Sequence, residues 1–210
     1  MVKAILFDFW GTLVENGVWS PIKQVRNILD LKLPFPEYVV RMERAMMTTE
    51  FKELKDAFNA VYQEFNTNVN EQNIEKLVGL WNKSWMLAKP YPKVTEMLHQ
   101  LKSKYKLILV SNSDCISIER VLDKFELRNL FDNIFLSYKV GLIKTDKNFF
   151  KHVLSELGLN VEDCIMVGDS IQSDVMSAKR IGMKAILIDR KNNRDFQPKI
   201  KDLRELENII

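Results

Sequence analysis

The sequence contains few of the residues that mark secreted, metal-clustered or membrane-spanning proteins. It has two cysteines and two histidines in 210 residues. The spacing of Cys115 and Cys164 fits no zinc or redox motif. No apolar run approaches the roughly 18 residues of a membrane span, and no signal peptide precedes the first strand-like segment. We therefore expect reduced thiols, a cytoplasmic location and no membrane partner.

Glycine, proline and charge of one sign are also scarce. Seven glycines and six prolines exclude a fibrous or low-complexity chain. The net charge of +3 is small, and no dense block of lysine and arginine occurs, so we expect no nucleic-acid partner. With 46% apolar residues the chain can bury a core. Its length predicts one domain, or one domain with an insertion.

The first strand-like run and the region that follows it differ in pattern. Residues 3–7 form a short apolar run that ends at Asp8, which predicts a buried strand. Between residues 15 and 89 the pattern predicts no strand. Apolar residues there recur at helical spacing, which predicts a small helical bundle. Its four helices are expected at residues 21–31, 36–47, 51–65 and 70–87.

From residue 90 onward, helical and strand patterns alternate. This alternation predicts a parallel sheet with helices on both faces, and hence an α/β fold into which the helical bundle is inserted. A short helix is expected at residues 203–210. The remaining helices are expected at residues 93–104, 116–125, 148–157 and 173–181, and the strands at 107–110, near 134–136, at 164–167 and at 185–188.

Polar residues follow several of these strands. In open α/β sheets ligands bind outside the carboxyl ends of the strands, so we expect these residues to share one site. Carboxylates are hard oxygen ligands that suit Mg²⁺ better than zinc. The residues are Asp8, Ser111, Asn112, Lys144, Asp169 and Asp174.

Each of these residues also has a structural interpretation. Asp8 and Asp174 could cap a turn or a helix, although a cap at Asp174 leaves Asp169 unexplained. Lys144 fits an anion-binding role or a solvated surface position. The segment Ser111-Asn112 fits either a phosphate cradle or an ordinary helix N-cap. The residues alone leave these alternatives open.

Taken together, four motifs resemble the haloacid dehalogenase superfamily of hydrolases, and the resemblance spans nearly the whole chain. It implies a Rossmann-like core, residues 1–14 and 90–210, with a helical cap, residues 15–89, inserted after the first motif. The motifs are Asp8-Phe9-Trp10-Gly11-Thr12-Leu13, Ser111-Asn112, Lys144, and Gly168-Asp169-Ser170 with Asp174.

The resemblance also implies roles for these positions. Asp8 is expected to be the nucleophile that forms an aspartyl-phosphate, and Thr12 to steady its loop. The transferring phosphoryl group is expected to bind Ser111, Asn112 and Lys144. Mg²⁺ is expected to bind the carboxylates of Asp8, Asp169 and Asp174 and the main-chain carbonyl of Trp10.

Trp10 departs from the pattern, because phosphatases of the superfamily carry a second acid at this position. An indole cannot transfer a proton at neutral pH, and loss of a general acid typically costs about 10²–10⁴-fold in rate. The leading hypothesis is a Mg²⁺-dependent phosphatase acting on a small phosphorylated substrate. In that enzyme Glu15 or a residue of the cap would replace the acid.

Two further hypotheses remain. Haloacid dehalogenases carry an aromatic residue at the position of Trp10, but they need no Mg²⁺ and lack the Gly168-Asp169 pair. A pseudoenzyme would bind Mg²⁺ and phosphate without turnover. Glu15, Asn16 and Trp19, at the entry to the cap, could contact substrate or serve as a hinge. The natural substrate and the oligomeric state stay open.

Overall fold

A computed structural model describes residues 2–210 of the chain and contains a six-stranded parallel sheet. Its central strands are almost wholly apolar and buried, as strands covered on both faces must be. In spatial order the strands are β5 (Asn133–Leu136), β4 (Lys106–Ser111), β1 (Ala4–Phe7), β6 (Cys164–Gly168), β7 (Lys184–Ile188) and β8 (Lys199–Ile200).

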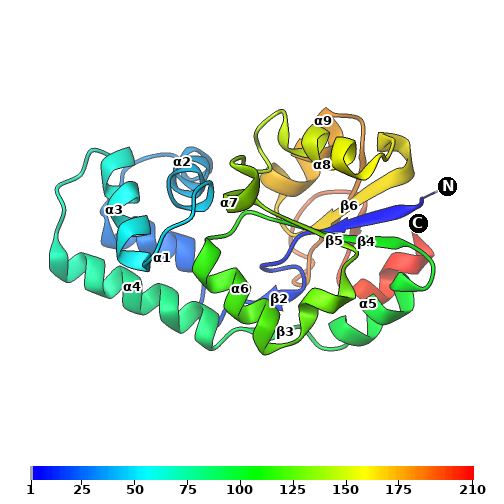
Figure 1. The fold of residues 1–210 in the computed structure, drawn as a ribbon, viewed down its shortest axis with the longest axis horizontal. Coiled ribbons are helices and arrows are strands. Elements are labelled where there is room, and N and C mark those ends of the chain that lie inside the picture. Colours follow the sequence, from blue (N-terminus) through cyan, green and yellow to red (C-terminus); the bar gives the residue numbers. More distant parts are fainter. Residues whose placement is uncertain (1) are drawn as a thin grey trace.

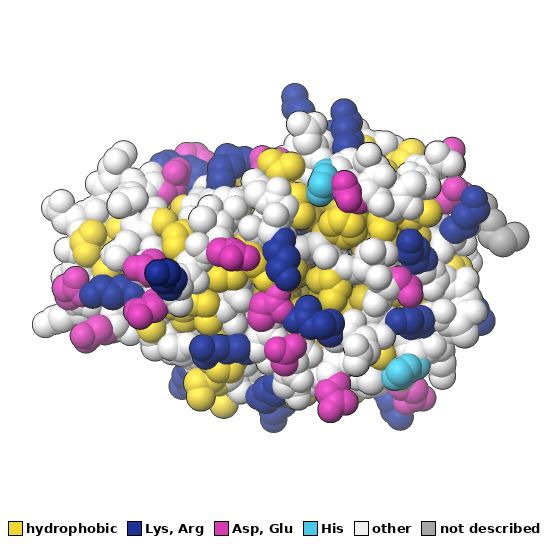
Figure 2. Space-filling view, viewed as in Figure 1, with side chains coloured by type: hydrophobic (Ala, Val, Ile, Leu, Met, Phe, Trp, Pro, Cys, Tyr) yellow, Lys and Arg dark blue, Asp and Glu magenta, His cyan; other side chains and the backbone are white. Residues whose placement is uncertain are grey.

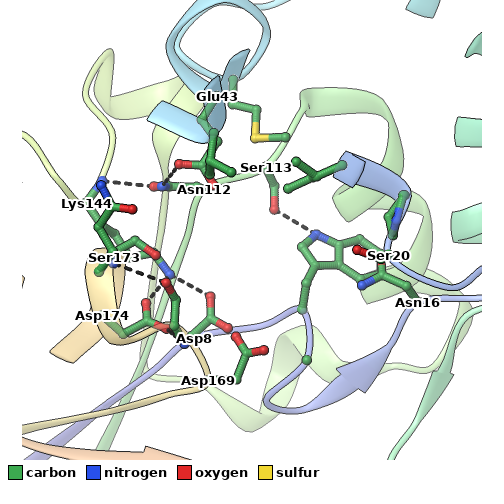
Figure 3. Close-up of a pocket in the computed structure, with 18 of the residues that line it drawn as sticks. Asp8, Asn16, Ser20, Glu43, Asn112, Ser113, Lys144, Asp169, Ser173 and Asp174 are labelled. Atoms are coloured by element: carbon green, nitrogen blue, oxygen red, sulfur yellow. Dashed lines mark hydrogen bonds and ion pairs between the residues drawn. The ribbon is translucent and has the colours of Figure 1, made fainter. Parts of the chain in front are cut away.

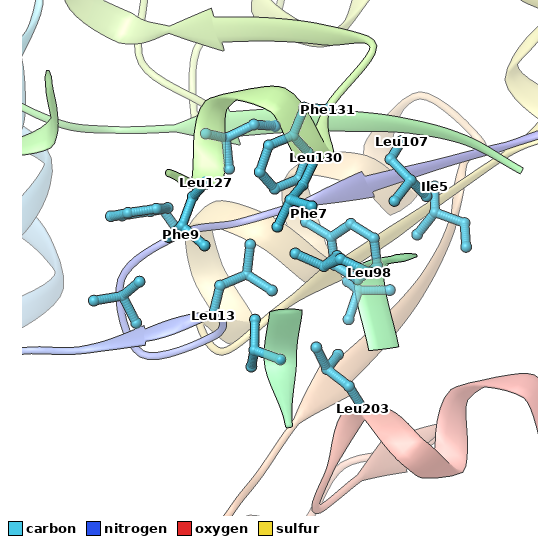
Figure 4. Packing of buried hydrophobic residues seen from close by; sticks show 14 of the residues in the cluster. Ile5, Phe7, Phe9, Leu13, Leu98, Leu107, Leu127, Leu130, Phe131 and Leu203 are labelled. Carbon is cyan, nitrogen blue, oxygen red and sulfur yellow. The ribbon is translucent and has the colours of Figure 1, made fainter. Parts of the chain in front are cut away.

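Alternate residues of each strand enter separate hydrophobic cores on the two faces of the sheet. In β1, Ile5 and Phe7 face one core, and Ala4 and Leu6 face the other. The first face is covered by α5 (Val94–Lys102), α6 (Cys115–Lys124), η1 (Leu127–Leu130) and η4 (Leu203–Asn208). Figure 4 shows Leu98 of α5, Leu130 of η1 and Leu203 of η4 in the same cluster as Phe7. The second is covered by α8 (Phe149–Leu157), the π-helical turn η3 (Ile171–Met176) and α9 (Ser177–Arg180).

A bundle of four helices stands beside the sheet, to the left in Figure 1, and has a hydrophobic core of its own. The sequence predicted all four helices, and their observed ends lie within about three residues of the predicted ones. They are α1 (Pro21–Ile28), α2 (Phe35–Met47), α3 (Leu54–Glu64) and α4 (Glu71–Met86). Helix α4 continues from the bundle to a position against α6.

The chain enters and leaves the bundle through a two-stranded ribbon that the sequence did not predict. Strands β2 (Val14–Glu15) and β3 (Lys89–Pro90) pair in antiparallel fashion at the two ends of the region expected to lack strands. Two residues are too short a run to show a period, so this pairing depends on contacts distant in sequence. The ribbon brings the two connections together.

Four other features differ from the sequence prediction. The helix expected at 173–181 is divided into η3 and α9, and the C-terminal helix expected at 203–210 is the 3₁₀ helix η4. The short helix α7 (Ser137–Val140) was not predicted. Strand β8 was not predicted either, since its two residues pair with β7 only through the fold.

The surface and the thiols agree with the composition. Basic and acidic side chains are interspersed over the face drawn in Figure 2, with no large block of one sign. Both cysteines are free. Within residues 2–210, no helix combines the length and the hydropathy that crossing a membrane requires.

Candidate active site

Three neighbouring strands end at one wall of a cavity of about 570 Å³. Asp8 follows β1, Ser111 ends β4 and Asp169 follows β6, with β1 between the other two strands. The chain order reverses at β1, which is where open α/β sheets bind ligands. Helices α1, α2 and α4 of the bundle line the opposite side of the cavity, and Figure 3 shows the side chains that face it.

Lys144 is the centre of a buried ion-pair network. Its side chain is 2% exposed, and its Nζ lies 2.6 Å from Asp8 Oδ1 and 2.5 Å from Asp174 Oδ1. Thr12 Oγ1 donates to the other Asp8 oxygen at 2.9 Å. Burial alone would lower the pKa of Lys144, but the two carboxylates raise it above its usual value. The surface interpretation of Lys144 is therefore wrong, and its ammonium group fixes the orientation of Asp8.

The two carboxylate oxygens of Asp174 bind different partners. Its Oδ2 accepts the main-chain N–H of Ser170 at 2.9 Å, and Ser170 Oγ accepts the N–H of Ser173, so the two residues cap η3 reciprocally. Its Oδ1 pairs with Lys144. Burial raises the pKa of Asp174 to about 6, against the opposing effect of Lys144. Capping thus explains one oxygen of Asp174, and the other belongs to the ion-pair network.

Asp169 completes a group of three carboxylates that could hold a metal ion. One oxygen each of Asp8, Asp169 and Asp174 lies within 4.8 Å of the others. Burial, followed by the charges of Asp8 and Asp174, raises the pKa of Asp169 to about 8. Three carboxylates face the single ammonium group of Lys144, so a divalent cation would neutralise the repulsion that remains. Hard oxygen donors in this number fit Mg²⁺.

Two glycines allow the carboxylates to lie this close to the backbone. Gly11 has φ of 78°, and a Cβ added there would lie 2.4 Å from Asp169 Oδ2. A Cβ added at Gly168 would lie 2.2 Å from Asp174 Oδ2. Both distances are far below van der Waals contact, so only glycine fits at either position.

Trp10 lines the cavity, and its indole N–H forms a hydrogen bond to a neighbouring lining residue. Its Nε1 donates to Ser113 Oγ at 2.9 Å, and Ser113 Oγ lies 2.8 Å from Ser111 Oγ. The indole also packs edge-on against Phe9, with ring centroids 5.0 Å apart. The N–H of Trp10 is therefore engaged in a structural hydrogen bond, in addition to being too weak an acid for proton transfer.

Asn112 links two parts of the site. Its Oδ1 accepts the main-chain N–H of Lys144 at 2.9 Å, and its Nδ2 donates to Glu43 at 2.8 Å. The N-cap of α6 is Asp114, whose Oδ1 accepts the N–H of Ile116 and of the following residue. Capping by Ser111 or Asn112 is therefore excluded, and both lie at the buried end of β4.

Glu43 is a site residue that the sequence analysis missed. It lies on α2 and is 8% exposed. Its carboxyl group accepts the hydrogen bond from Asn112 at the cavity wall (Figure 3). Burial raises its pKa to about 7; Lys144 opposes this shift, and Asp174 and Asp8 add to it. A signal was present in the sequence, because Glu43 falls at helical spacing among the apolar residues of α2. An acid at a buried helical position needs an explanation.

The three residues at the entry to the bundle differ in position. Asn16 lines the cavity, and its Oδ1 accepts a hydrogen bond from Ser84 Oγ at 3.2 Å. Trp19 is 70% exposed, and neither it nor Glu15 lines the cavity. Glu15 lies in β2 with its side chain exposed. Of the sequence-predicted residues at this entry, the structure brings only Asn16 to the site.

Known proteins resemble this chain over almost its entire length. It is 26% identical to a glyceraldehyde 3-phosphate phosphatase from Methanocaldococcus jannaschii, over 100% of this chain and 97% of the relative. A crystal structure of a HAD phosphatase from Thermococcus onnurineus superposes with a TM-score of 0.65 and 24% identity, covering 99% of this chain and 97% of that one. The fold is also that of a 2-haloacid dehalogenase from Pseudomonas syringae, with a TM-score of 0.66, 15% identity and coverage of 99% and 97%.

A family model described as haloacid dehalogenase-like hydrolase matches residues 2–182. That match includes the first motif, the buried lysine and the three carboxylates described above. The Rossmann-like α/β sheet agrees with it. The chain therefore belongs to the haloacid dehalogenase-like hydrolases.

Proposed function

We propose that this protein is a Mg²⁺-dependent phosphatase that acts on a small phosphorylated metabolite in the cytoplasm through an aspartyl-phosphate intermediate. Residues 1–14 and 90–210 serve as its catalytic core, and residues 15–89 as a cap. The observation that supports this proposal most directly is the group of three carboxylates, Asp8, Asp169 and Asp174, of which Asp8 and Asp174 pair with the buried Lys144 ammonium. The relative named as a glyceraldehyde 3-phosphate phosphatase supports the substrate class.

The residues of the chain fit the steps of phosphoryl transfer. Asp8, held by Thr12 and Lys144, presents a carboxylate oxygen to the phosphorus at the end of β1. Lys144, Ser111 and the main chain after β4 are placed to bind the phosphoryl oxygens. Asp8, Asp169, Asp174 and the carbonyl of Trp10 would hold the cation, which when bound supplies positive charge for the phosphoryl oxygens.

Dehalogenation is the second candidate, and one observation favours it. The aromatic side chain of Trp10 stands where a phosphatase needs an acid, and halide leaves without a proton. The carboxylates argue the other way. A dehalogenase needs no cation, so nothing bound at the site would offset the repulsion of Asp8 by Asp169 and Asp174. We therefore place phosphatase activity first, dehalogenation second and binding without turnover third.

The first test is release of phosphate from p-nitrophenyl phosphate with Mg²⁺ and with a chelator. We expect turnover only with Mg²⁺ and loss of turnover in Asp8→Asn, because a neutral amide replaces the nucleophilic carboxylate. Asp56→Asn is the matched control, since Asp56 is exposed on α3 outside the cavity. Turnover that persists in Asp8→Asn would show that Asp8 is not the nucleophile.

A second substrate separates the alternatives. If p-nitrophenyl phosphate is not cleaved, chloride release from short 2-chloro acids in the presence of chelator would establish dehalogenation. If neither substrate turns over, a rise in melting temperature with phosphate that appears only in the presence of Mg²⁺ would establish the binding module.

A further inference from the structure

The proposed reaction needs a proton donor that the first motif does not supply. When the phosphorus–oxygen bond of an alkyl phosphate breaks, the electron pair goes to an alkoxide-like oxygen, which must receive a proton. The Trp10 N–H is bound to Ser113, and the Lys144 ammonium is shared between two carboxylates. Neither group is free to donate a proton to the leaving oxygen.

Apart from the three carboxylates that the proposed reaction assigns to the cation, the other ionisable groups that line the cavity leave one candidate. Asp114 accepts Trp81 Nε1 at 2.9 Å on one oxygen and the N–H groups that begin α6 on the other, so both of its carboxylate oxygens already have partners. Lys23 lies at an exposed position, and Arg194 donates to the main-chain oxygen of Asp169. Glu43 is the acid that the bundle contributes to the cavity lining.

The position of Glu43 suits a group that acts on the leaving oxygen. In an in-line displacement the leaving oxygen points away from the attacking carboxylate. Asp8 attacks from the end of the sheet, so the leaving oxygen faces the bundle, where α2 places Glu43 (Figure 3). Asn112 Nδ2 fixes Glu43 Oε2 at 2.8 Å. Within residues 2–210, no hydrogen-bond partner occupies Oε1, which leaves that oxygen for the substrate.

The protonation state of Glu43 agrees with this position. Burial raises its pKa to about 7, with Lys144 opposing the shift and Asp174 and Asp8 adding to it. A group that titrates near neutral pH can both give and take a proton under working conditions. An exposed glutamate would be ionised almost completely at that pH and could act only as a base.

We infer that Glu43 is the general acid and base of the proposed phosphatase reaction, in place of the acid that Trp10 displaces. This role rests on the proposed function. As Asp8 attacks the phosphorus and the bond to the leaving oxygen breaks, Glu43 transfers its proton to that oxygen and an alcohol departs. Glu43, now a carboxylate, takes a proton from water. The water oxygen attacks the phosphorus, the bond to Asp8 breaks, and phosphate and protonated Glu43 result.

The leaving group of the substrate provides the test, with Glu43→Gln as the variant. Glutamine keeps the size of the side chain and can accept the Asn112 N–H, but it cannot donate a proton as an acid. With glycerol 3-phosphate, whose alkoxide leaves poorly, we expect kcat/KM to fall about 10²–10⁴-fold. With p-nitrophenyl phosphate, whose leaving group needs no proton, we expect a fall in kcat/KM of less than about tenfold. Glu37→Gln, on the exposed side of the same helix, is the matched control.

Two further readouts distinguish catalysis from packing. In Glu43→Gln the phosphorylated Asp8 should accumulate, because no base activates water, so p-nitrophenol should appear in a burst that matches the enzyme concentration. Adding Trp10→Asp to Glu43→Gln should restore at least part of the lost activity on glycerol 3-phosphate, because it provides an acid at the usual position.

The outcomes separate this role from the proposed function. An equal loss on both substrates without a burst would assign Glu43 a structural role and overturn the inference while the phosphatase stands. Unchanged activity in Glu43→Gln would overturn it as well. Absence of Mg²⁺-dependent turnover by the unmodified protein on either substrate would overturn the proposed function, and the role of Glu43 with it.

Discussion

At the scale of single residues, the geometry of the site depends on glycines as well as on the polar side chains. Gly168, at the end of β6, leaves the space that the Asp174 carboxylate occupies. Any side chain there would move Asp174 away from Lys144 and from the main-chain N–H that it accepts. The absence of a side chain at Gly168 therefore allows Asp174 to lie close to Lys144 and to the other carboxylates.

We expect Gly168→Ala to weaken Mg²⁺ binding by about 10–100-fold, as loss of outer support for a metal site does. Its added Cβ would lie 2.2 Å from Asp174 Oδ2, and overpacking of this kind costs about 1–3 kcal/mol in the free energy of unfolding. Titration of Mg²⁺-dependent activity and urea unfolding measure the two effects.

Gly79 provides the control for this substitution. It lies inside α4, and a Cβ added there meets nothing within 4 Å. Gly79→Ala should raise the free energy of unfolding by about 0.5–1 kcal/mol, because alanine loses less backbone entropy in a helix. Equal Mg²⁺ affinity in Gly168→Ala and the unmodified protein would mean that Asp174 does not contribute to the metal site.

The sequence predicted most of these residues because motif spacing and strand ends are local properties. Asp8, Asp169 and Asp174 each follow a recognisable apolar run, and the parallel sheet brings them together. The role of Lys144 followed only from the resemblance, because the residues alone also fitted a solvated surface position. Glu43 could not be placed in this way. Whether a helical acid faces solvent or a cavity depends on how its helix packs, which no local pattern gives.

At the scale of elements, helix α2 links the bundle chemically to the sheet. It contributes hydrophobic residues to the core of the bundle and presents Glu43 to Asn112. Glu43 should therefore be one of the residues through which the free energy of unfolding depends on pH, beside Asp169 and Asp174. Glu43 retains its proton up to a pKa of about 7 in the folded protein, against 4.5 as its ordinary value.

A folded pKa above the unfolded one means that the folded state binds more protons between these values. The contribution of Glu43 to stability is then full below about pH 4.5 and is lost as the pH rises through about 7. We expect the stability of the unmodified protein, relative to Glu43→Gln, to fall by on the order of 3 kcal/mol between pH 4.5 and pH 8. Urea unfolding of both proteins in chelator measures this difference. A difference that does not change with pH would show that Glu43 has the same pKa in the folded and the unfolded protein.

The elements themselves were predicted to differing degrees for physical reasons. Helices of the bundle have a clear apolar period, so their existence and approximate ends followed from the sequence. The ribbon of Val14–Glu15 with Lys89–Pro90 did not, because two residues carry no period and their partners lie far apart in the chain. The π-helical turn of η3 bends the backbone where Asp174 reaches back to Ser170, and helical spacing alone cannot show this.

At the scale of the whole molecule, two separately packed bodies meet around a polar cavity. The bundle and the sheet have distinct hydrophobic cores, and α4 and α6 pack against each other between them. The three carboxylates lie at this cavity, and Lys144 pairs with two of them, Asp8 and Asp174. The charge of the site is therefore balanced only in part by Lys144.

This imbalance predicts how a cation affects the stability of the entire protein. Anything that binds the folded state alone stabilises it by mass action, by about 2.7 kcal/mol at a concentration 100 times its dissociation constant. Mg²⁺ should therefore raise the melting temperature by several degrees, since about 1 kcal/mol corresponds to about 2–4 °C for a chain of this length. Thermal unfolding with Mg²⁺ and with chelator measures the shift.

Asp169→Asn tests the electrostatic origin of this shift. In chelator the variant should melt at a higher temperature than the unmodified protein, because desolvation and the charges of Asp8 and Asp174 disfavour the ionised carboxylate of Asp169. Adding Mg²⁺ should not change the melting temperature of the variant from its value in chelator, because the variant lacks one of the carboxylates that would bind the cation. Asp56→Asn, at an exposed position, should keep the full response to Mg²⁺. A variant that is less stable in chelator, yet responds to Mg²⁺ as fully as the unmodified protein, would make Asp169 a structural residue and remove it from the metal site.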